Sequence, residues 1–304
     1  MKRGGWRAAA MAAGLAWAAA GRAAEAGAPP PGAGGGVRLL PEVSGMGSLS
    51  WYGGSKDELQ KARYVNEGIL ELDFALARFG EEWTLRGRFG MVAEMGKSIS
   101  QHLPFSPKEM EYEVSPYVEW RRGGWMARGG WSHVCQHLVY KEQDEPWYEL
   151  EGSNVPPDVY WNRLYAGFGR EESRPELLRK AAFGEGRGEI PRFTWWAEAG
   201  GYLRSLPGVD DETLYSQNDW AADLVADLRA IPYAGRKWLL AGTARTHLLF
   251  DDGGEAFLRQ WLGVEATFDG SGFGATVFLG GHVVDEHPRD DKDGLLEAGA
   301  RLFF

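Results

Sequence analysis

The chain has 304 residues, of which 44% are hydrophobic and 13% aromatic, and it carries a formal net charge of −10 at pH 7. This length suits one large domain or two small ones, and the negative charge argues against nucleic acid as a partner, because phosphate backbones attract basic surfaces. The single cysteine, Cys135, excludes an intramolecular disulfide. Beyond the N-terminal segment, no run approaches the roughly 20 apolar residues of a membrane-spanning helix.

The N-terminal segment, residues 1–26, has the pattern of an export signal. Basic residues precede the apolar run Ala8–Gly21, and Ala24–Ala26 offers a cleavage site of the small-x-small type. The following residues, 27–42, are rich in Pro and Gly and predict a flexible linker. We therefore expect an exported protein whose folded domain spans residues 43–304.

From there the chain alternates between apolar and polar residues. In Trp83–Met95, for example, Leu85 and Phe89 fall on one face, and Arg86 and Arg88 on the other. Side chains two apart in a strand share a face, so the alternation predicts strands with one apolar and one charged face. The expected strands are Met46–Tyr52, Ile69–Phe79, Trp83–Met95, Glu111–Arg121, Trp125–Tyr140, Val159–Phe168, Arg192–Arg204, Asp219–Arg229, Lys237–His247, Arg259–Asp269, Phe273–His282 and Gly294–Phe304.

These segments predict a transmembrane antiparallel β-barrel of about twelve strands. Many reach the roughly ten residues needed to cross a bilayer, whereas strands of soluble sandwiches average about five or six. A soluble periplasmic β-protein is the alternative, but its core could not hide the charged faces, while a polar lumen can. Both signs recur on neighbouring strands, so we expect ion pairs that plug the lumen, with a narrow porin or solute channel as the alternative. The expected lumen-lining residues are Arg86, Arg88, Glu119, Arg121, Asp223, Arg245 and Glu265.

The connections support a barrel in the outer membrane of a Gram-negative-type bacterium. Short periplasmic turns and long outer loops are typical of such barrels. Here Arg170–Pro191 is long where a turn is expected and could hold a short helix at Glu172–Phe183, and Asp251–Glu255 is short where a loop is expected. The short links are Gly80–Glu82, Arg122–Gly124, Ile231–Arg236 and Asp269–Gly272, and the long ones are Gly53–Val65, Gly96–Met110, Lys141–Asp158 and Val283–Asp293.

The last strand ends in Leu-Phe-Phe, with Phe304 on its apolar face. A terminal aromatic residue on an amphipathic last strand resembles the assembly signal of bacterial outer-membrane barrels. This resemblance implies two partners: the barrel-assembly machinery, which would act on the C-terminal strand, and the lipid of the outer membrane.

Candidate catalytic residues lie on two neighbouring strands. His133, Cys135 and His137 continue an apolar stripe that begins at Trp125, so we expect them on the lipid-facing side near the outer end of their strand. The next strand descends from the same end and should place Asn162 beside them, with Arg163 facing the lumen. We therefore expect one cluster near the outer-leaflet boundary.

The cluster resembles that of outer-membrane phospholipase A, a twelve-stranded barrel family. His133-x-Cys135 stands where that family has His-x-Ser, and the segment Trp161–Tyr165 is similar to its Trp-Asn-Arg segment. The resemblance implies that His133 is the general base, that Asn162 orients the imidazole and that Cys135 stands at the nucleophile position. His137 is a further candidate for a catalytic role.

A second resemblance covers more of the chain. HVCQHLVYKE, residues 133–142, is similar to the His-x-Ser-Ser-His-Leu-Gly-Asp-Glu motif of an uncharacterised family of bacterial outer-membrane proteins. The preceding EYEVSPYVEWRRGGWMARGGWSH and the later NDWAADLVAD also fit that family. This family has no established activity, so the resemblance implies an outer-membrane barrel of unknown specific role.

Simpler interpretations remain open for the same residues. His133, Cys135 and His137 could be polar residues at the barrel rim, or two imidazoles and a thiolate that hold a metal ion. Calcium is a second candidate ligand, because acidic residues recur in the expected outer loops. Surface acidity explains them equally well; they are Glu142, Asp144, Glu145, Asp251, Asp252, Asp290, Asp291 and Asp293.

Overall fold

The protein is described by a computed structural model. The expected export signal, the expected helix Glu172–Phe183 and Phe304 lie outside the described residues. So do five of the acidic loop residues: Glu142, Asp144, Glu145, Asp290 and Asp291. The described residues are 37–56, 58–97, 106–138, 158–170, 191–203, 216–217, 220–235, 237–269, 273–287 and 292–303.

Twelve long strands form the wall, as the alternation of apolar and polar residues predicts, and a thirteenth strand, β8, has two residues. One short helix, α2 (Glu58–Arg63), lies between the first two strands. Within the described residues, no helix is long and apolar enough to span a membrane. The strands are β1 (Val37–Gly53), β2 (Asn66–Phe79), β3 (Trp83–Gly96), β4 (Ser106–Arg122), β5 (Trp125–Leu138), β6 (Asp158–Arg170), β7 (Phe193–Leu203), β8 (Ser216–Gln217), β9 (Trp220–Ala234), β10 (Trp238–Asp251), β11 (Ala256–Asp269), β12 (Gly274–Asp285) and β13 (Leu296–Phe303).

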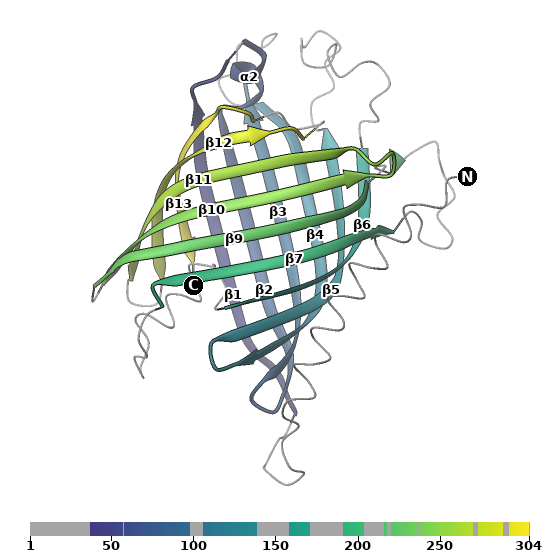
Figure 1. The fold of residues 1–304 in the computed structure, drawn as a ribbon, viewed down its shortest axis with the longest axis vertical. Helices are drawn as coiled ribbons and strands as arrows, with labels where there is room; N and C mark the ends of the chain where they lie inside the picture. Colours follow the sequence, from purple (N-terminus) through teal and green to yellow (C-terminus); the bar gives the residue numbers. More distant parts are fainter. Residues whose placement is uncertain are drawn as a thin grey trace.

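The long strands close into a barrel, with their tilt visible in Figure 1. Each pairs antiparallel with the next long strand along the chain, and β13 pairs back onto β1, where Met46 lies opposite Phe303. Closure leaves no long strand with an unpaired edge, which is the condition for strands in a bilayer. The predicted twelve-stranded antiparallel barrel is therefore confirmed.

Several boundaries differ from those predicted. β1 begins at Val37, inside the expected linker, because Val37 and Leu39 already alternate with Arg38 and Val37 pairs with Phe79 of β2. β4 begins at Ser106 instead of Glu111, so the loop before it is shorter than expected.

Two small elements were missed altogether, and both lie at the end of the barrel that carries α2. β8 pairs parallel with Val159 and Tyr160 of β6, beyond the point where β7 ends. α2 packs closely on β3: a Cβ at Gly96 would come within 2.2 Å of the Ala62 carbonyl oxygen. Glycine is therefore required at position 96 for the helix to dock.

The outer face of the barrel is apolar and ends in an aromatic girdle. At the turn end, Trp125 stacks on Phe168 at 5.2 Å between ring centroids, and Trp195 contacts both rings. Aromatic side chains at this position mark a membrane–water interface. Other exposed aromatic residues next to the same turns are Phe79, Trp83, Phe193, Tyr233, Trp238, Phe268 and Phe273.

The inner face carries buried ion pairs. Arg86 binds Asp73 with 2.6 Å between Nε and Oδ1, and Glu265 is held by both Arg229 and Arg301. Lys292, which lies between β12 and β13, bridges Glu67 on β2 and Glu94 on β3, each at 2.7 Å. Charges on the inner face of a barrel avoid lipid, and here they pair with opposite charges on nearby strands.

Candidate functional site

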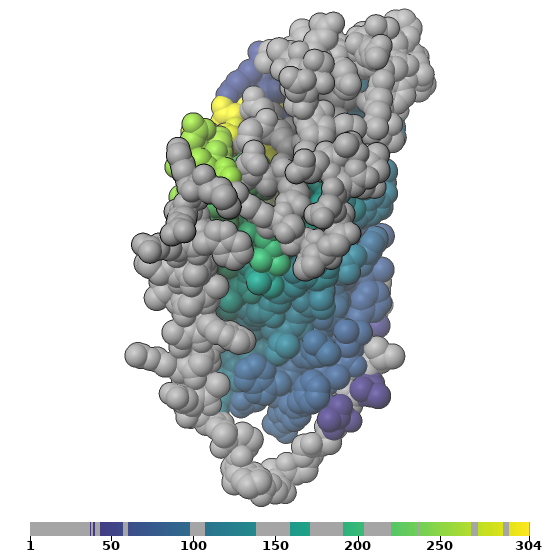
Figure 2. All heavy atoms as spheres, turned by 90° about the vertical axis from the view of Figure 1, so that its right-hand side faces the viewer, coloured from purple at the N-terminus to yellow at the C-terminus, as the bar shows by residue number. Residues whose placement is uncertain are grey.

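The outer-wall cluster lies on β5 and β6, within the wall formed by the blue to teal strands, which Figure 2 shows from its side. His133 pairs in register with Asn162, and Cys135 pairs with Tyr112 on β4 and with Tyr160 on β6. Their side chains share the outward face with exposed apolar residues such as Val114 and Leu164. The structure therefore brings three of the candidate residues together on one face.

The central contact is a hydrogen bond between His133 and Asn162. The Nδ1–H of His133 donates to Oδ1 of Asn162 over 3.0 Å. Asn162 is only 1% exposed, so this residue is covered by its neighbours, although we expected it on the outer surface. Between β5 and β7 it is flanked on both sides, since Leu203 of β7 lies opposite it in register.

Aromatic rings surround the imidazole of His133. Trp131 stacks on it with 6.0 Å between centroids, and Tyr160 lies 6.1 Å away on β6. His137 is two residues beyond Cys135 on the same face and contacts the Tyr112 ring at 6.0 Å. Reasoning from the sequence missed Tyr112, although counting parity along β4 would place it on this face.

The depth of the cluster follows from the girdle. His133 lies eight residues beyond Trp125 along β5, and at about 3.3 Å per residue and a tilt of about 40° this rises roughly 20 Å above the girdle. Cys135 is two residues farther along β5 and therefore lies roughly 25 Å above the girdle, which is about the height of the apolar band of such barrels. The cluster therefore lies near the outer boundary of the bilayer, where lipid ester groups are found.

All seven expected lumen-lining residues form ion pairs. Arg86 also approaches Glu119, at 3.8 Å, and Arg88 approaches Asp73 at 3.8 Å. Two of the seven side chains are exposed while they are paired: Arg245, which binds Asp227, is 64% exposed and Arg121 is 39% exposed. The remaining pairs are Arg121–Glu119, Asp223–Arg163 and Glu265–Arg229.

These pairs make a prediction about conductance. In planar bilayers we expect the wild-type barrel to show no porin-like conductance steps, because long paired side chains from alternate strands, such as Arg229 and Arg301 on Glu265, extend into the lumen. Single-channel recording checks this expectation. Regular steps whose size changes in Glu265→Gln would contradict it and support the channel alternative.

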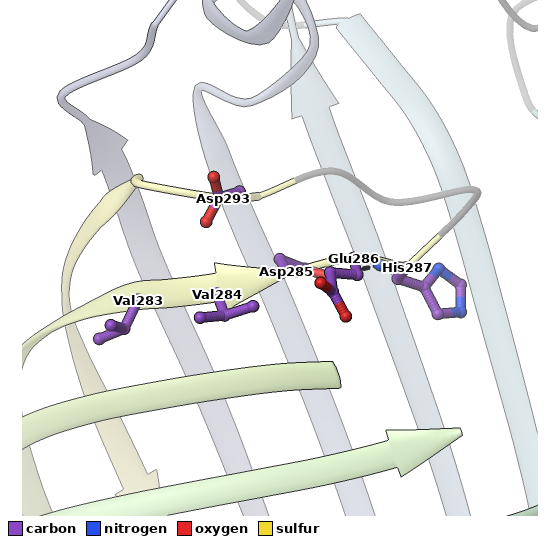
Figure 3. A pocket seen from close by; sticks show the side chains of 6 residues that line it. All are labelled: Val283, Val284, Asp285, Glu286, His287 and Asp293. Atoms are coloured by element: carbon purple, nitrogen blue, oxygen red, sulfur yellow. Dashed lines mark hydrogen bonds between the residues drawn. The ribbon is translucent and has the colours of Figure 1, made fainter. Parts of the chain in front are cut away.

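A hollow of about 570 Å³ lies at the outer end of β12, lined by Val283, Val284, Asp285, Glu286, His287 and Asp293 (Figure 3). Two of its three carboxylates have cationic partners, since Asp285 binds Arg259 at 3.0 Å and Asp293 binds Lys56, and the third, Glu286, accepts a hydrogen bond from the Leu258 amide. Asp251, which lies outside the hollow but is another of the acidic loop residues considered for calcium, accepts a hydrogen bond from the Glu255 amide. In the part of the chain that the structure describes, no group of three His, Cys, Asp or Glu side chains is arranged to hold a metal ion.

The fold and the two faces of its wall define a class. A closed antiparallel barrel with an apolar outer band, an aromatic girdle and a charged lumen is the architecture of bacterial outer-membrane proteins. The protein is an outer-membrane β-barrel that contacts membrane lipid with its outer face.

Comparisons with known proteins do not narrow this class. No family model matches the chain, and no curated protein matches it. Among solved structures, it is similar to outer membrane phospholipase A from Escherichia coli (14% identity, 88% of this chain and 98% of that chain, TM-score 0.44). It is also similar to an outer membrane channel from Pseudomonas putida F1 (12%, 91% and 99%, TM-score 0.49) and to the translocator domain of the autotransporter NalP from Neisseria meningitidis (12%, 96% and 97%, TM-score 0.44). At these values the similarity carries no argument about function.

Proposed function

We propose that the protein is a lipid-facing acyl hydrolase in which Cys135 is the nucleophile, His133 the general base and Asn162 the residue that orients the imidazole. The hydrogen bond between His133 and Asn162 carries the proposal. Because an amide oxygen only accepts, Nδ1 of His133 bears the proton and Nε2 is left to accept one. This tautomer suits a base that lies next to a nucleophile.

The reaction proceeds in two balanced steps. In the first, Nε2 of His133 takes the proton of the Cys135 thiol, and the thiolate attacks the ester carbonyl carbon of a lipid. The carbon–oxygen bond breaks, the alcohol leaves with the proton from His133, and the acyl chain stays on Cys135 as a thioester. In the second step, His133 takes a proton from water, the hydroxide attacks the thioester, and a fatty acid leaves as the thiol is restored.

The proposed substrate class is a membrane lipid with ester-linked acyl chains. Cys135 lies near the outer boundary of the apolar band by the depth argument above, so an ester group can reach it while its acyl chain stays in the bilayer. The ring of Tyr160 and the ring of Trp131 beside His133 supply an amphipathic rim that suits the same boundary. A thiol at the nucleophile position supplies a thiolate more readily than a hydroxyl supplies an alkoxide.

Reconstitution tests this proposal. The full-length protein in phospholipid liposomes is expected to release fatty acid, and Cys135→Ala is expected to abolish the release. Intact-mass measurement should find one acyl group on the wild type early in the reaction, lost on treatment with hydroxylamine. Absence of fatty-acid release by the wild type, or release that persists in Cys135→Ala, rules the proposal out.

The route to the membrane is part of the same proposal. We infer that residues 1–26 are removed on export and that the assembly machinery recognises the C-terminal strand β13 together with the terminal residue Phe304. The alternation in β13 supports this, because its even-numbered residues from Leu296 to Leu302 are exposed on the outer face and Phe303 is buried.

A further inference from the structure

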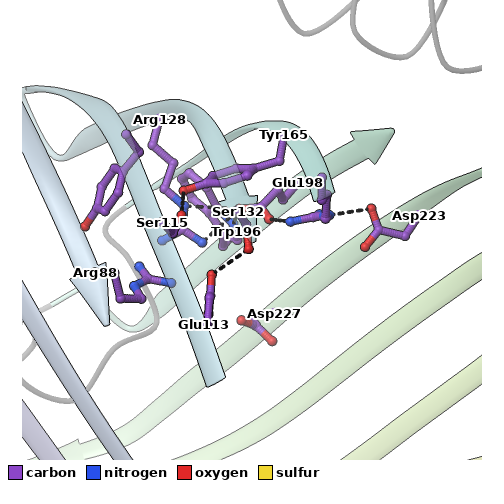
Figure 4. Close-up of polar contacts among 12 residues, drawn as sticks. Arg88, Glu113, Ser115, Arg128, Ser132, Tyr165, Trp196, Glu198, Asp223 and Asp227 are labelled. Atoms are coloured by element: carbon purple, nitrogen blue, oxygen red, sulfur yellow. Dashed lines mark hydrogen bonds and ion pairs between the residues drawn. The ribbon is translucent and has the colours of Figure 1, made fainter. Parts of the chain in front are cut away.

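The lumen side of the wall behind the candidate site is unusually well connected. Ser132 and Arg163 pair in register, one step from the His133–Asn162 pair, and point to the opposite face. In the lumen, Ser132 donates a hydrogen bond to Glu113 on β4 over 3.0 Å. Figure 4 shows the contact between Ser132 and Glu113, with Glu198 and Asp223 in the same region.

Arg163 reaches across two strands. Its Nη1 lies 2.7 Å from Oε1 of Glu198 on β7, and its Nε lies 2.9 Å from Oδ1 of Asp223 on β9. The crossing passes over Gly200 of β7, where a Cβ would come within 2.2 Å of the Arg163 Nε and 2.3 Å of the Asp223 Oδ1. Glycine at position 200 is therefore what allows this double ion pair to form.

The same carboxylate also holds the neighbouring strand of the site. Arg128 of β5 binds Glu198 at 2.8 Å, so Glu198 joins the two strands that carry His133 and Asn162. The side chains of Arg128, Arg163 and Glu198 are 11%, 12% and 7% exposed. Each guanidinium uses two nitrogens: Arg128 places Nε and Nη2 on Oε2 of Glu198, and Arg163 places one nitrogen on Glu198 and one on Asp223. Buried contacts of a planar guanidinium have a narrow geometry, so they restrict how β5 and β6 can rotate relative to each other.

We propose that Arg163 is a positioning residue for the His133–Asn162 pair. Because residues 162 and 163 are adjacent in β6, the double ion pair of Arg163 fixes the backbone rotation that aims the Asn162 side chain at His133. Catalytic groups need to be held within roughly 0.5 Å of their productive positions. The role rests on the proposed function, since it concerns the orientation of that base.

The test compares two buried arginines. In Arg163→Met, Glu198 keeps Arg128 and Asp223 keeps its contact with His247, and in the control Arg229→Met, Glu265 keeps Arg301, so each affected carboxylate retains a partner side chain. Arg229 lies on β9, which does not pair with β5 or β6. Arg163→Met affects two carboxylates and Arg229→Met affects one, so the free energy of unfolding is measured for both variants, and only Arg163→Met acts directly behind the site.

The readout is the rate at which iodoacetamide alkylates Cys135 in folded protein in micelles, measured from pH 6 to pH 9. Arg163→Met is expected to slow alkylation about tenfold at neutral pH and to move the profile to higher pH, because a misaimed imidazole no longer takes the thiol proton. Arg229→Met is expected to stay within about twofold of the wild type. Gly200→Ala should give the same pH profile as Arg163→Met, because the added methyl group displaces the Arg163 guanidinium. The alkylation rate of Arg163→Lys should fall between those of Arg163→Met and the wild type.

Each outcome decides the point. An unchanged profile in Arg163→Met, or equal changes in Arg163→Met and Arg229→Met, overturns the proposal. If Arg163→Met does not fold, as judged by heat-modifiable mobility on a gel, Gly200→Ala and Arg163→Lys decide in the same way. Alkylation needs no lipid turnover, so a wild type that releases no fatty acid defeats the proposed function while a shift specific to Arg163 still supports positioning.

Discussion

His133→Ala is expected to lower the rate of fatty-acid release from liposomes by at least about 10³-fold. A positioned general base contributes about 10² to 10⁴ in rate, and without the imidazole the thiol of Cys135 keeps its proton while Asn162 loses its hydrogen-bond partner. The rate of fatty-acid release, normalised to the amount of folded barrel, measures the effect.

Val114→Ala serves as the control, because Val114 is the cross-strand neighbour of His133 on β4 and its 49% exposed side chain has no polar atom. We expect its rate within about twofold of the wild type. Asn162→Ala should fall between the two, since it misorients the base without removing it. A His133→Ala variant that keeps wild-type activity would exclude the assigned base.

Glu198→Leu is expected to destabilise the barrel by about 3–5 kcal/mol, because it leaves Arg128 and Arg163 as buried cations with one carboxylate fewer between them. The free energy of unfolding, measured from urea titration in micelles with tryptophan fluorescence, gives the value. Glu198→Gln should cost less, because its amide oxygen can still accept a hydrogen bond.

The control for burial is the lumen pair between Arg245 and Asp227. The Arg245 side chain is 64% exposed, and exposed pairs contribute about 0–1 kcal/mol, so Arg245→Met should change the free energy of unfolding little. Equal losses in Glu198→Leu and Arg245→Met would mean that burial does not set the strength of these lumen pairs.

Alternation along the chain was enough to predict the barrel, because each strand has to expose one face to lipid and the other to the lumen. Arg86 and Leu85, neighbours on β3, already show both environments. The start of β1 was misplaced because residues 37–42 follow a Gly-rich run and include Pro41, while pairing with β2 extends the strand through them. β8 has two residues, too few for any periodicity.

The relative positions of the candidate residues were predicted in part. The alternation of side chains along a strand and the alternating direction of the strands were enough to predict that His133 and Asn162 lie on one face, because both rules depend only on nearby residues. The bridge from Arg163 to Asp223 was not predictable, because it joins residues 60 positions apart across an intervening strand. The requirement for glycine at position 200 becomes visible only when that crossing is known.

The ion pairs of Lys292 affect how strongly the barrel resists separation of its first and last strands. The first and last strands, β1 and β13, meet at a seam that is held by eight residue pairs from Met46 to Gly53. Lys292 precedes β13 and binds Glu67 and Glu94 on the far side of that seam, with its Nζ over the rings of both Tyr52 and Tyr64. A lateral force that separates β1 from β13 therefore has to break the buried Lys292 ion pairs as well as the backbone hydrogen bonds of the seam. These ion pairs can form only after the last hairpin, β12 and β13, has joined the barrel.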